Sequence, residues 1–207
     1  MAAGLFITLE GGEGAGKSTQ VESVATWFRE RDRSVVVTRE PGGTSAGEAI
    51  RRILLDREHI SISPETELLM MFAARAQHIH EVIRPALAAG QVVICDRFTD
   101  ASYAYQGGGR GIARKQIQAL ENWVQDDLRP DLTLLLDVPV ETGMERVGRR
   151  GIADRFEAEA EAFFQSVRET YQAIAKRYPE RVRLIDASQS IAAVTRAITQ
   201  VLEQEDL

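Results

Sequence analysis

Residues 11–18 read Gly-Gly-Glu-Gly-Ala-Gly-Lys-Ser, and this stretch decides how the rest of the 207-residue chain is interpreted. It has the spacing G-x-x-x-x-G-K-[ST], with Gly11, Gly16, Lys17 and Ser18 in the fixed positions. Glycines adopt backbone conformations that other residues avoid, which lets successive N–H groups close around phosphate oxygens. In such a loop the lysine reaches the β- and γ-phosphates and the hydroxyl binds Mg²⁺. The stretch therefore predicts a nucleotide site rather than a simple glycine-rich turn.

The sequence on either side of the loop predicts an α/β fold. Near-continuous apolar runs indicate buried parallel strands at Leu5–Glu10, Ser34–Thr38, Gln91–Asp96, Leu132–Val138 and Val182–Asp186. Helical patterns occupy Lys17–Arg31, Gly47–Asp56, Ser63–Ala89, Arg114–Asp127, Val140–Arg149, Glu157–Lys176 and Ile191–Glu203. Because strands that alternate with helices form parallel sheets, we predict one P-loop domain over residues 1–207, with a five-stranded parallel sheet flanked by helices.

The composition narrows the kind of protein. Hydrophobic residues make up 44% of the chain and charged residues 27%, which is typical of globular proteins. The net charge of −6 disfavours a protein that binds nucleic acid. The single cysteine, Cys95, excludes an intramolecular disulfide and fits a reducing cytosol. Since no stretch reads as a signal peptide or a membrane span, we expect a cytoplasmic protein with no membrane partner.

The loop predicts a nucleotide but leaves the reaction open between a small-molecule kinase, a GTPase-like switch and an ATPase. The guanine-specifying Asn-Lys-x-Asp and the transporter-type Leu-Ser-Gly-Gly-Gln are both absent. A kinase needs a second phosphate site, and Asp96 and Arg97 follow directly after a predicted strand. At that edge of a parallel sheet Asp96 can hold Mg²⁺ through water and Arg97 can bind a phosphate. An exposed ion pair at the end of the strand is the alternative.

Longer stretches make the kinase interpretation specific. They are Asp96-Arg97-Phe98 through Tyr105-Gln106-Gly107-Gly108-Gly109-Arg110-Gly111, Thr38-Arg39-Glu40-Pro41-Gly42-Gly43-Thr44, and Arg150-Gly151 followed by Asp154-Arg155-Phe156-Glu157. Together with the phosphate loop they resemble the motifs of bacterial thymidylate kinases, in the same order along nearly the whole chain. The resemblance implies a nucleoside monophosphate kinase, usually dimeric, that transfers the ATP γ-phosphoryl group to dTMP with Mg²⁺, for dTTP synthesis. A kinase for another nucleotide or nucleoside, or a P-loop ATPase or switch that binds a protein, is the alternative.

The resemblance also implies which individual residues form the ATP site, the metal site and the acceptor-phosphate site. The positions that match the ATP site are Gly11, Gly12, Glu13, Gly14, Ala15, Gly16, Lys17, Ser18 and Thr19. Ser18 and Asp96 are expected to hold the metal, directly or through water. Glu40, Arg51 and Arg97 are expected to line the acceptor phosphate, and Glu13 to face the acceptor sugar and phosphate.

The base side of the acceptor has its own set of expected contacts. By match to the family, Arg75 reaches the thymine carbonyl, Ser102 and Gln106 touch the base edge, and Tyr105 packs against the deoxyribose. The charge alone leaves Arg75 open between a surface residue and a recognition group. His78 and His80, two residues apart, do not share a helix face, and we expect both to be surface histidines, like His59.

The platform for the base departs from the family pattern. Bacterial thymidylate kinases usually place a stacking phenylalanine four residues before the thymine-contacting arginine, but here that position is Met71 and Phe72 comes three residues before. Because both offsets lie on the same helix face, either Phe72 stacks on the base or Met71 takes its place.

The densest basic stretch lies near residues 146–157 and predicts an arginine-bearing lid. Arginines that close over the transferred phosphoryl group are worth ~10³–10⁵ in rate. Some family members carry an arginine in the phosphate loop, where this chain has Gly14, so the charge must come from elsewhere. We expect Arg150 first and Arg155 second to supply it, beside Lys17 and Arg97 as catalytic residues. On charge alone the stretch is equally a solvated helix end.

Overall fold

The computed structural model describes residues 3–56, 61–148, 155–157 and 159–205. Five parallel strands form one sheet in the order β2-β3-β1-β4-β5. They are β1 (Leu5–Glu10), β2 (Val35–Arg39), β3 (Val92–Asp96), β4 (Leu132–Asp137) and β5 (Val182–Asp186). The predicted fold class and strands are confirmed, with boundaries shifted by one residue at most at either end. β1 lies between β3 and β4, so the loop after it is flanked by the ends of both neighbours.

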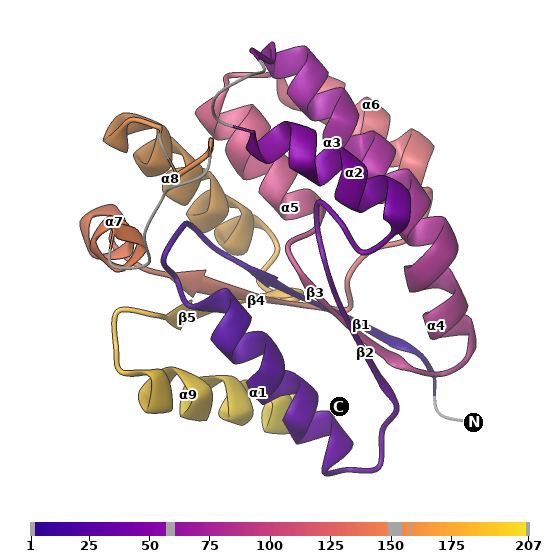
Figure 1. Cartoon of the computed structure of the whole chain (residues 1–207). Helices are drawn as coiled ribbons and strands as arrows, with labels where there is room; N and C mark the ends of the chain where they lie inside the picture. Colours follow the sequence, from indigo (N-terminus) through magenta and orange to yellow (C-terminus); the bar gives the residue numbers. More distant parts are fainter. Residues whose placement is uncertain (1–2, 57–60, 149–154, 158, 206–207) are drawn as a thin grey trace.

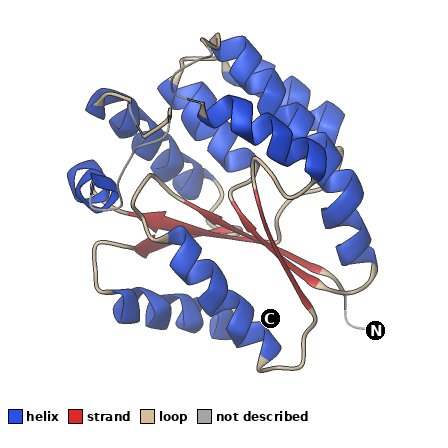
Figure 2. Ribbon diagram, in the orientation of Figure 1, coloured by secondary structure: helices blue, strands red, loops and turns tan. Residues whose placement is uncertain are grey.

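Helices cover both faces of the sheet, which explains why its three central strands, β3, β1 and β4, are buried along nearly their whole length (Figure 2). On one face α1 (Lys17–Arg29) and α9 (Ile191–Gln204) pack together, and their apolar side chains join those of the strands in one core cluster (Figure 1). The other face carries α2 (Ser45–Leu55), α3 (Pro64–His78), α4 (Arg84–Ala88), α5 (Thr99–Ser102), α6 (Arg114–Gln125) and α8 (Glu161–Arg177) (Figure 1). A further helix, α7 (Val140–Gly148), follows β4. Among the described residues no helix has the length and apolarity needed to cross a membrane.

The long helix predicted from Ser63 to Ala89 is continuous but not uniform. Ser63 caps it by accepting a hydrogen bond from the Thr66 amide. Between α3 and α4 the backbone forms a π-helical turn, η1 (Ile79–Ile83). Pro85 follows it and has no N–H to donate, so the wider turn accommodates the proline without ending the helix.

The glycine cluster Gly107–Gly111 is not the surface turn that its composition suggests. A π-helical segment, η2 (Tyr103–Gly109), continues α5 and contains the first three of these glycines. A Cβ on Gly108 would lie 2.2 Å from the Thr170 hydroxyl oxygen, and one on Gly109 would lie 2.3 Å from the Phe163 ring. Side chains are therefore excluded because η2 packs directly against α8.

Candidate active site

The loops at the carboxyl ends of β1, β2 and β3 and the segment after β5 surround one cavity of about 780 Å³. One end is lined by the phosphate loop, Arg146 and the Ala187–Val194 segment, and the other by residues of α3, α5 and η2. Both predicted halves of the site, for donor and for acceptor, therefore open into the same space.

In the phosphate loop, Lys17 makes hydrogen bonds to carbonyl groups of the loop itself. The Lys17 ammonium donates to the carbonyl oxygens of Gly12 at 2.9 Å and Gly11 at 3.1 Å. Burial lowers the pKa of Lys17 below its usual value. Gly14 has φ +69° and a Cβ there would lie 2.1 Å from the Gly143 carbonyl, so this position requires glycine. Gly16, with φ +86°, is the N-cap residue of α1, and the free amides of the first helical turn face the loop.

Ser18 and Asp96 lie together beside the loop. The Ser18 hydroxyl oxygen is 3.4 Å from an Asp96 carboxylate oxygen, and both residues line the cavity. Two hard oxygen ligands on one side of a phosphate site suit Mg²⁺, which usually keeps several waters and takes further oxygens from the substrate. The described residues contain no group of three or more His, Cys, Asp or Glu side chains placed to hold a metal by themselves.

Arg97 is held by partners from both sides of the site. It donates to the Glu13 carboxylate at 2.6 Å and to the Gly11 carbonyl at 2.8 Å. Tyr105 donates to the same Glu13 oxygen at 2.8 Å, and the Arg97 guanidinium lies 4.7 Å from the Tyr105 ring centre. Arg97 also has φ +72°, an unusual conformation for a non-glycine residue and one that is found at functional sites.

The buried carboxyl group of Glu10 is connected to these contacts of Arg97 through Tyr171. Glu10, the last residue of β1, accepts hydrogen bonds from the Phe98 amide and the Tyr171 hydroxyl, both at 2.7 Å. Burial, followed by the negative charge of Asp100, raises the pKa of Glu10 to about 8. Tyr171 also contacts the Arg97 guanidinium at 3.3 Å, so Glu10 and Arg97 are connected through one hydroxyl.

Arg75 is buried, with 2% of its surface exposed, and four neighbours fix its guanidinium. Its Nε donates to Glu40 at 2.7 Å, and its Nη2 donates to the Phe98 carbonyl at 3.1 Å and the Ser102 hydroxyl at 3.0 Å. Its Cζ lies 4.5 Å from the centre of the Phe72 ring. Nη1 is buried and makes no hydrogen bond with any residue that the structure describes. Arg75 lines the cavity, and an unpaired buried donor on a lining residue is a candidate hydrogen-bond donor for a ligand.

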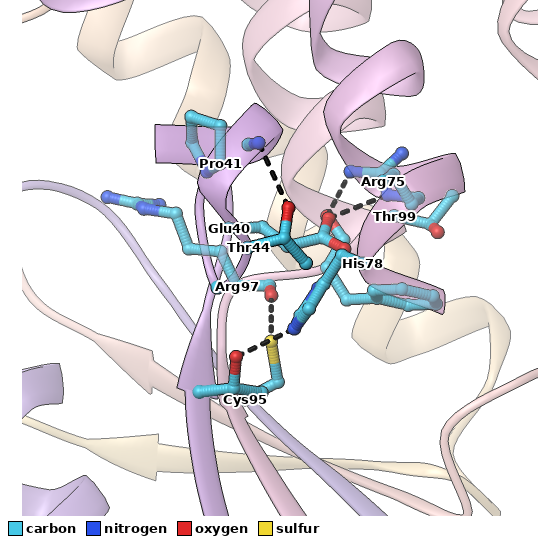
Figure 3. A network of polar contacts seen from close by, with 12 residues as sticks. Glu40, Pro41, Thr44, Arg75, His78, Cys95, Arg97 and Thr99 are labelled. Atoms are coloured by element: carbon cyan, nitrogen blue, oxygen red, sulfur yellow. Dashed lines mark hydrogen bonds and ion pairs between the residues drawn. The ribbon is translucent and has the colours of Figure 1, made fainter. Parts of the chain in front are cut away.

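The prediction for His78 is wrong. The imidazole is fully buried under the loop that carries Glu40, with Nδ1 2.9 Å from the second Glu40 oxygen and Nε2 2.6 Å from the Thr38 hydroxyl (Figure 3). His78 is the last residue of α3 and lies on its buried side with Phe72 and Arg75, so the ring is directed inward. His80 is exposed as predicted, and His59 lies outside the described residues.

The base platform is divided between the two candidate residues. Met71 lines the cavity, whereas Phe72 is buried beneath the Arg75 guanidinium and is not among the lining residues.

Gln106 lines the same end of the cavity and donates to Glu67 at 2.9 Å. Arg51, from α2, donates to the Pro41 carbonyl at 2.8 Å and also borders the cavity.

Only part of the predicted lid lies within the residues that the structure describes. Arg150 lies outside the described residues. Arg155 is directed toward α3 and α2, where it donates to Glu67 at 2.6 Å and to the Leu54 carbonyl at 2.7 Å. Phe156 and Glu157, which follow it, line the cavity.

Several buried polar groups escaped the sequence analysis, among them Glu10, Glu67 and Tyr171, and His78 was placed at the surface. Glu67 is fully buried and accepts hydrogen bonds from Gln106, Arg110 and Arg155. Glu67, Arg75 and His78 recur at helical spacing on the buried side of α3, together with Leu68 and Phe72. That periodicity is a signal the sequence does contain, because a polar residue in phase with an apolar stripe is directed into the core.

Comparison with known proteins gives one consistent result. The family model for thymidylate kinase matches residues 9–198. The thymidylate kinase of Pseudomonas entomophila (strain L48) is 58% identical over 200 residues, which cover 97% of this chain and 95% of the relative. That of Pseudomonas syringae pv. tomato (strain ATCC BAA-871 / DC3000) is 58% identical over 201 residues, 97% and 96% of the two chains. The crystal structure of thymidylate kinase from Ehrlichia chaffeensis has a TM-score of 0.79 at 33% identity, covering 97% of this chain and 99% of that one.

Proposed function

The chain belongs to the thymidylate kinase family, and from this premise we propose which of its residues perform the family's reaction. The enzyme transfers the γ-phosphoryl group of ATP to dTMP and releases dTDP and ADP. The observation that supports the residue assignment best is the shared cavity, which joins the phosphate loop at one end to the free Nη1 donor of Arg75 at the other.

The donor half binds ATP through the loop Gly11–Thr19 and the first turn of α1. Lys17 leaves the Gly11 and Gly12 carbonyls when the phosphates enter and binds the β- and γ-phosphates in their place. Mg²⁺, when bound, neutralises charge on the phosphates, and Ser18 and Asp96 are the residues that hold it. The reaction then needs positioning and charge neutralisation more than covalent chemistry.

The acceptor phosphate is held opposite the loop by cationic side chains. Arg97 directs its guanidinium to Glu13 and Gly11 at the loop, which supports a role for it between donor and acceptor. Arg51 borders the cavity beside Pro41 and Glu40, where it adds a second positive charge. These contacts align the dTMP phosphate oxygen with the γ-phosphorus.

The base and sugar occupy the other end of the cavity. The Nη1 group of Arg75 donates to the O4 carbonyl of thymine, a contact that the amino group of cytosine cannot accept. Ser102 and Gln106 border the base edge, and Met71 supplies the apolar platform while Phe72 supports Arg75 from beneath. Tyr105, held by Glu13, packs against the deoxyribose.

The lid supplies the remaining charge. We assign Arg150 to the transferred phosphoryl group, because Gly14 offers no side chain there. Arg155 takes second place, since it donates to Glu67 and the Leu54 carbonyl and is not among the residues that line the cavity.

The remaining assignments concern the whole protein. We propose a single domain over residues 1–207 that works as a homodimer in the cytoplasm, without nucleic-acid or membrane partners. The free, buried thiol of Cys95 is compatible with a reducing compartment.

A coupled assay of ADP release, with each nucleoside monophosphate offered in turn, tests the assignment. The wild-type enzyme is expected to prefer dTMP over dCMP and dGMP. Arg75→Ala should reduce the dTMP preference roughly ten- to a hundredfold, the effect of one unpaired buried donor. An unchanged ratio of dTMP to dCMP turnover would show that Arg75 does not read the base.

A further inference from the structure

His78 belongs to no part of the site assigned so far, yet it is buried beside the acceptor end of the cavity. Its two ring nitrogens both have partners, Glu40 on one side and Thr38 on the other. The neighbouring backbone is shaped around the ring, because a Cβ on Gly43, which has φ +78°, would lie 2.7 Å from the imidazole. A ring enclosed in this way has one orientation.

The contact with Glu40 matters because that carboxylate is shared. One oxygen accepts from His78 Nδ1 and the other from Arg75 Nε, so each partner has one oxygen (Figure 3). Glu40 is 5% exposed, so an oxygen that loses its protein partner has little access to water. With His78 in place, Glu40 contacts Arg75 through Nε alone, and Nη2 is left for Phe98 and Ser102.

Without the imidazole, the Glu40 carboxylate has both oxygens available for Arg75, so it can accept two hydrogen bonds from that guanidinium instead of one. Arginine and a carboxylate prefer two parallel hydrogen bonds, from Nε and the adjacent Nη. The freed Glu40 oxygen would then compete with Phe98 and Ser102 for Nη2, and the guanidinium would turn. Nη1, the donor that faces the ligand, would turn with it.

We propose that His78 is a positioning residue for base recognition: by occupying one oxygen of Glu40, it fixes the orientation in which Arg75 presents Nη1 to the pyrimidine. The inference rests on the proposed function, in which Arg75 reads the base. His78 itself touches no substrate. A proton on Nδ1 lets the ring donate to Glu40, while Nε2 and the Thr38 hydroxyl share the second hydrogen bond.

The matched pair His78→Asn and His78→Leu tests the proposal. Asparagine and leucine have the same branched shape, but only asparagine places an N–H near the position of Nδ1. Steady-state kinetics of the full-length enzyme would give KM for dTMP and for ATP, and kcat/KM for dTMP and dCMP. His80→Leu, an exposed histidine two residues away, is the control.

We expect His78→Leu to raise KM for dTMP about tenfold and to lower the dTMP/dCMP ratio of kcat/KM about tenfold, the effect of one lost hydrogen bond to a charged group. KM for ATP should stay within about twofold, and His78→Asn should restore the ratio to within about threefold of the wild type. A purely structural role would lower the melting temperature and the active fraction without changing the ratio. An unchanged ratio in His78→Leu, or equal losses in both variants, would overturn the proposal.

A second variant keeps the test available if His78→Leu does not fold. Thr38→Val retains the imidazole and nearly the same volume but removes the partner of Nε2, so the ring is no longer held against Glu40. It should raise KM for dTMP and lower the ratio in the same direction, and unchanged values would overturn the proposal. A wild-type enzyme that does not phosphorylate dTMP would instead overturn the proposed function.

Discussion

Lys17 shows how one residue is prepared for a ligand. Its ammonium is buried and held by two carbonyl oxygens of its own loop, and burial lowers its pKa. Carbonyl groups are weaker partners for a cation than phosphate, so we expect the phosphates to displace them and to stabilise the charged form.

Lys17→Met is therefore expected to lower kcat about 10²–10³-fold, as the loss of a preorganised charge at a reacting group does. The acceptor side is untouched, and the dissociation constant for dTMP should change less than about twofold, an effect below ~0.4 kcal/mol. Isothermal titration calorimetry of each ligand checks this. Lost dTMP affinity with intact ATP affinity would contradict the assignment.

The raised pKa of Glu10 predicts how the free energy of unfolding changes with pH. Its pKa is about 8 in the folded protein, against an ordinary value of 4.5, because burial favours the neutral carboxyl. Between these pH values the folded state holds a proton that the unfolded state has lost. The free energy of unfolding therefore falls as pH rises through this interval, by up to about 1.4 kcal/mol per pH unit from this group, and levels off above the folded pKa.

Glu10→Gln should remove that fall, since the amide imitates the protonated acid and can donate to the Tyr171 hydroxyl oxygen. Urea denaturation between pH 5 and 9, with Glu22→Gln as an exposed control, would measure the difference. Parallel pH profiles for wild type and Glu10→Gln would contradict the raised pKa.

At the scale of elements, the contact between η2 and α8 positions the base end of the cavity. η2 carries Tyr105 and Gln106, and its glycines let it approach α8 closely. A Cβ on Gly108 would lie 2.8 Å from the Ser166 backbone oxygen, and this atom cannot move aside as a side chain can.

Gly108→Ala should consequently push η2 from α8, destabilise the protein by about 1–3 kcal/mol and raise KM for dTMP. Gly107→Ala is the matched control, because its Cβ would meet only the flexible end of Ile117 at 3.2 Å. Thermal denaturation and steady-state kinetics of both variants check the prediction. Equal stability of the two variants would mean that the approach of η2 to α8 is not limiting.

The lid is the second element with a testable role. An arginine that acts chiefly in the transition state lowers kcat when it is lost and changes KM for dTMP little. We expect this of Arg150→Ala, and a smaller effect of Arg155→Ala, whose guanidinium contacts Glu67. Arg149→Ala is the neighbouring control. A kcat of Arg150→Ala within about threefold of the parent, less than ~0.7 kcal/mol of barrier, would refute the lid role.

The elements also show how far sequence reasoning reaches. Apolar runs predicted all five strands, because strand burial is a local pattern. Tyr103–Gly109 was not predicted as a helix, since glycine-rich composition normally indicates a turn and only the tertiary contact with α8 reverses that preference. His78 was assigned to the surface because its spacing was compared with that of His80 alone and not with the apolar stripe of the helix, and the sequence does not show which residue would be its buried partner. Glu40, its partner, lies 38 residues earlier in the chain.

At the scale of the whole molecule, the sheet explains why motifs far apart in sequence form one site. The phosphate loop, Glu40 and Arg97 follow three neighbouring strands, β1, β2 and β3, at the same edge. Parallel strands bring their carboxyl ends together, so the order of motifs predicted a common cleft. The helices that cover the sheet also form an outer surface, away from this cleft, where we predict no ligand-binding motif.

That outer surface contains the strongest sign of an oligomer. Trp123 on α6 is 82% exposed and Leu69 on α3 is 56% exposed, on two helices that pack against each other. Ala73 and Ala76 continue the exposed side of α3 with short side chains that allow a partner to approach closely. Exposed tryptophan is enriched at protein interfaces and often dominates their affinity.

Trp123→Lys is therefore expected to weaken a homodimer at least about thirtyfold, the loss typical of an interface hot spot of 2 kcal/mol or more. Sedimentation velocity over a range of concentrations would follow the dissociation, while kcat of the monomer tests whether each cavity works alone. Leu184→Lys is the control, since Leu184 is 49% exposed but lies on β5, at the far edge of the sheet. A wild-type protein that is monomeric at high concentration would refute the dimer. A dimer that Trp123→Lys leaves intact would place the interface on another face, because a charge at the centre of an apolar contact is not tolerated without loss of affinity.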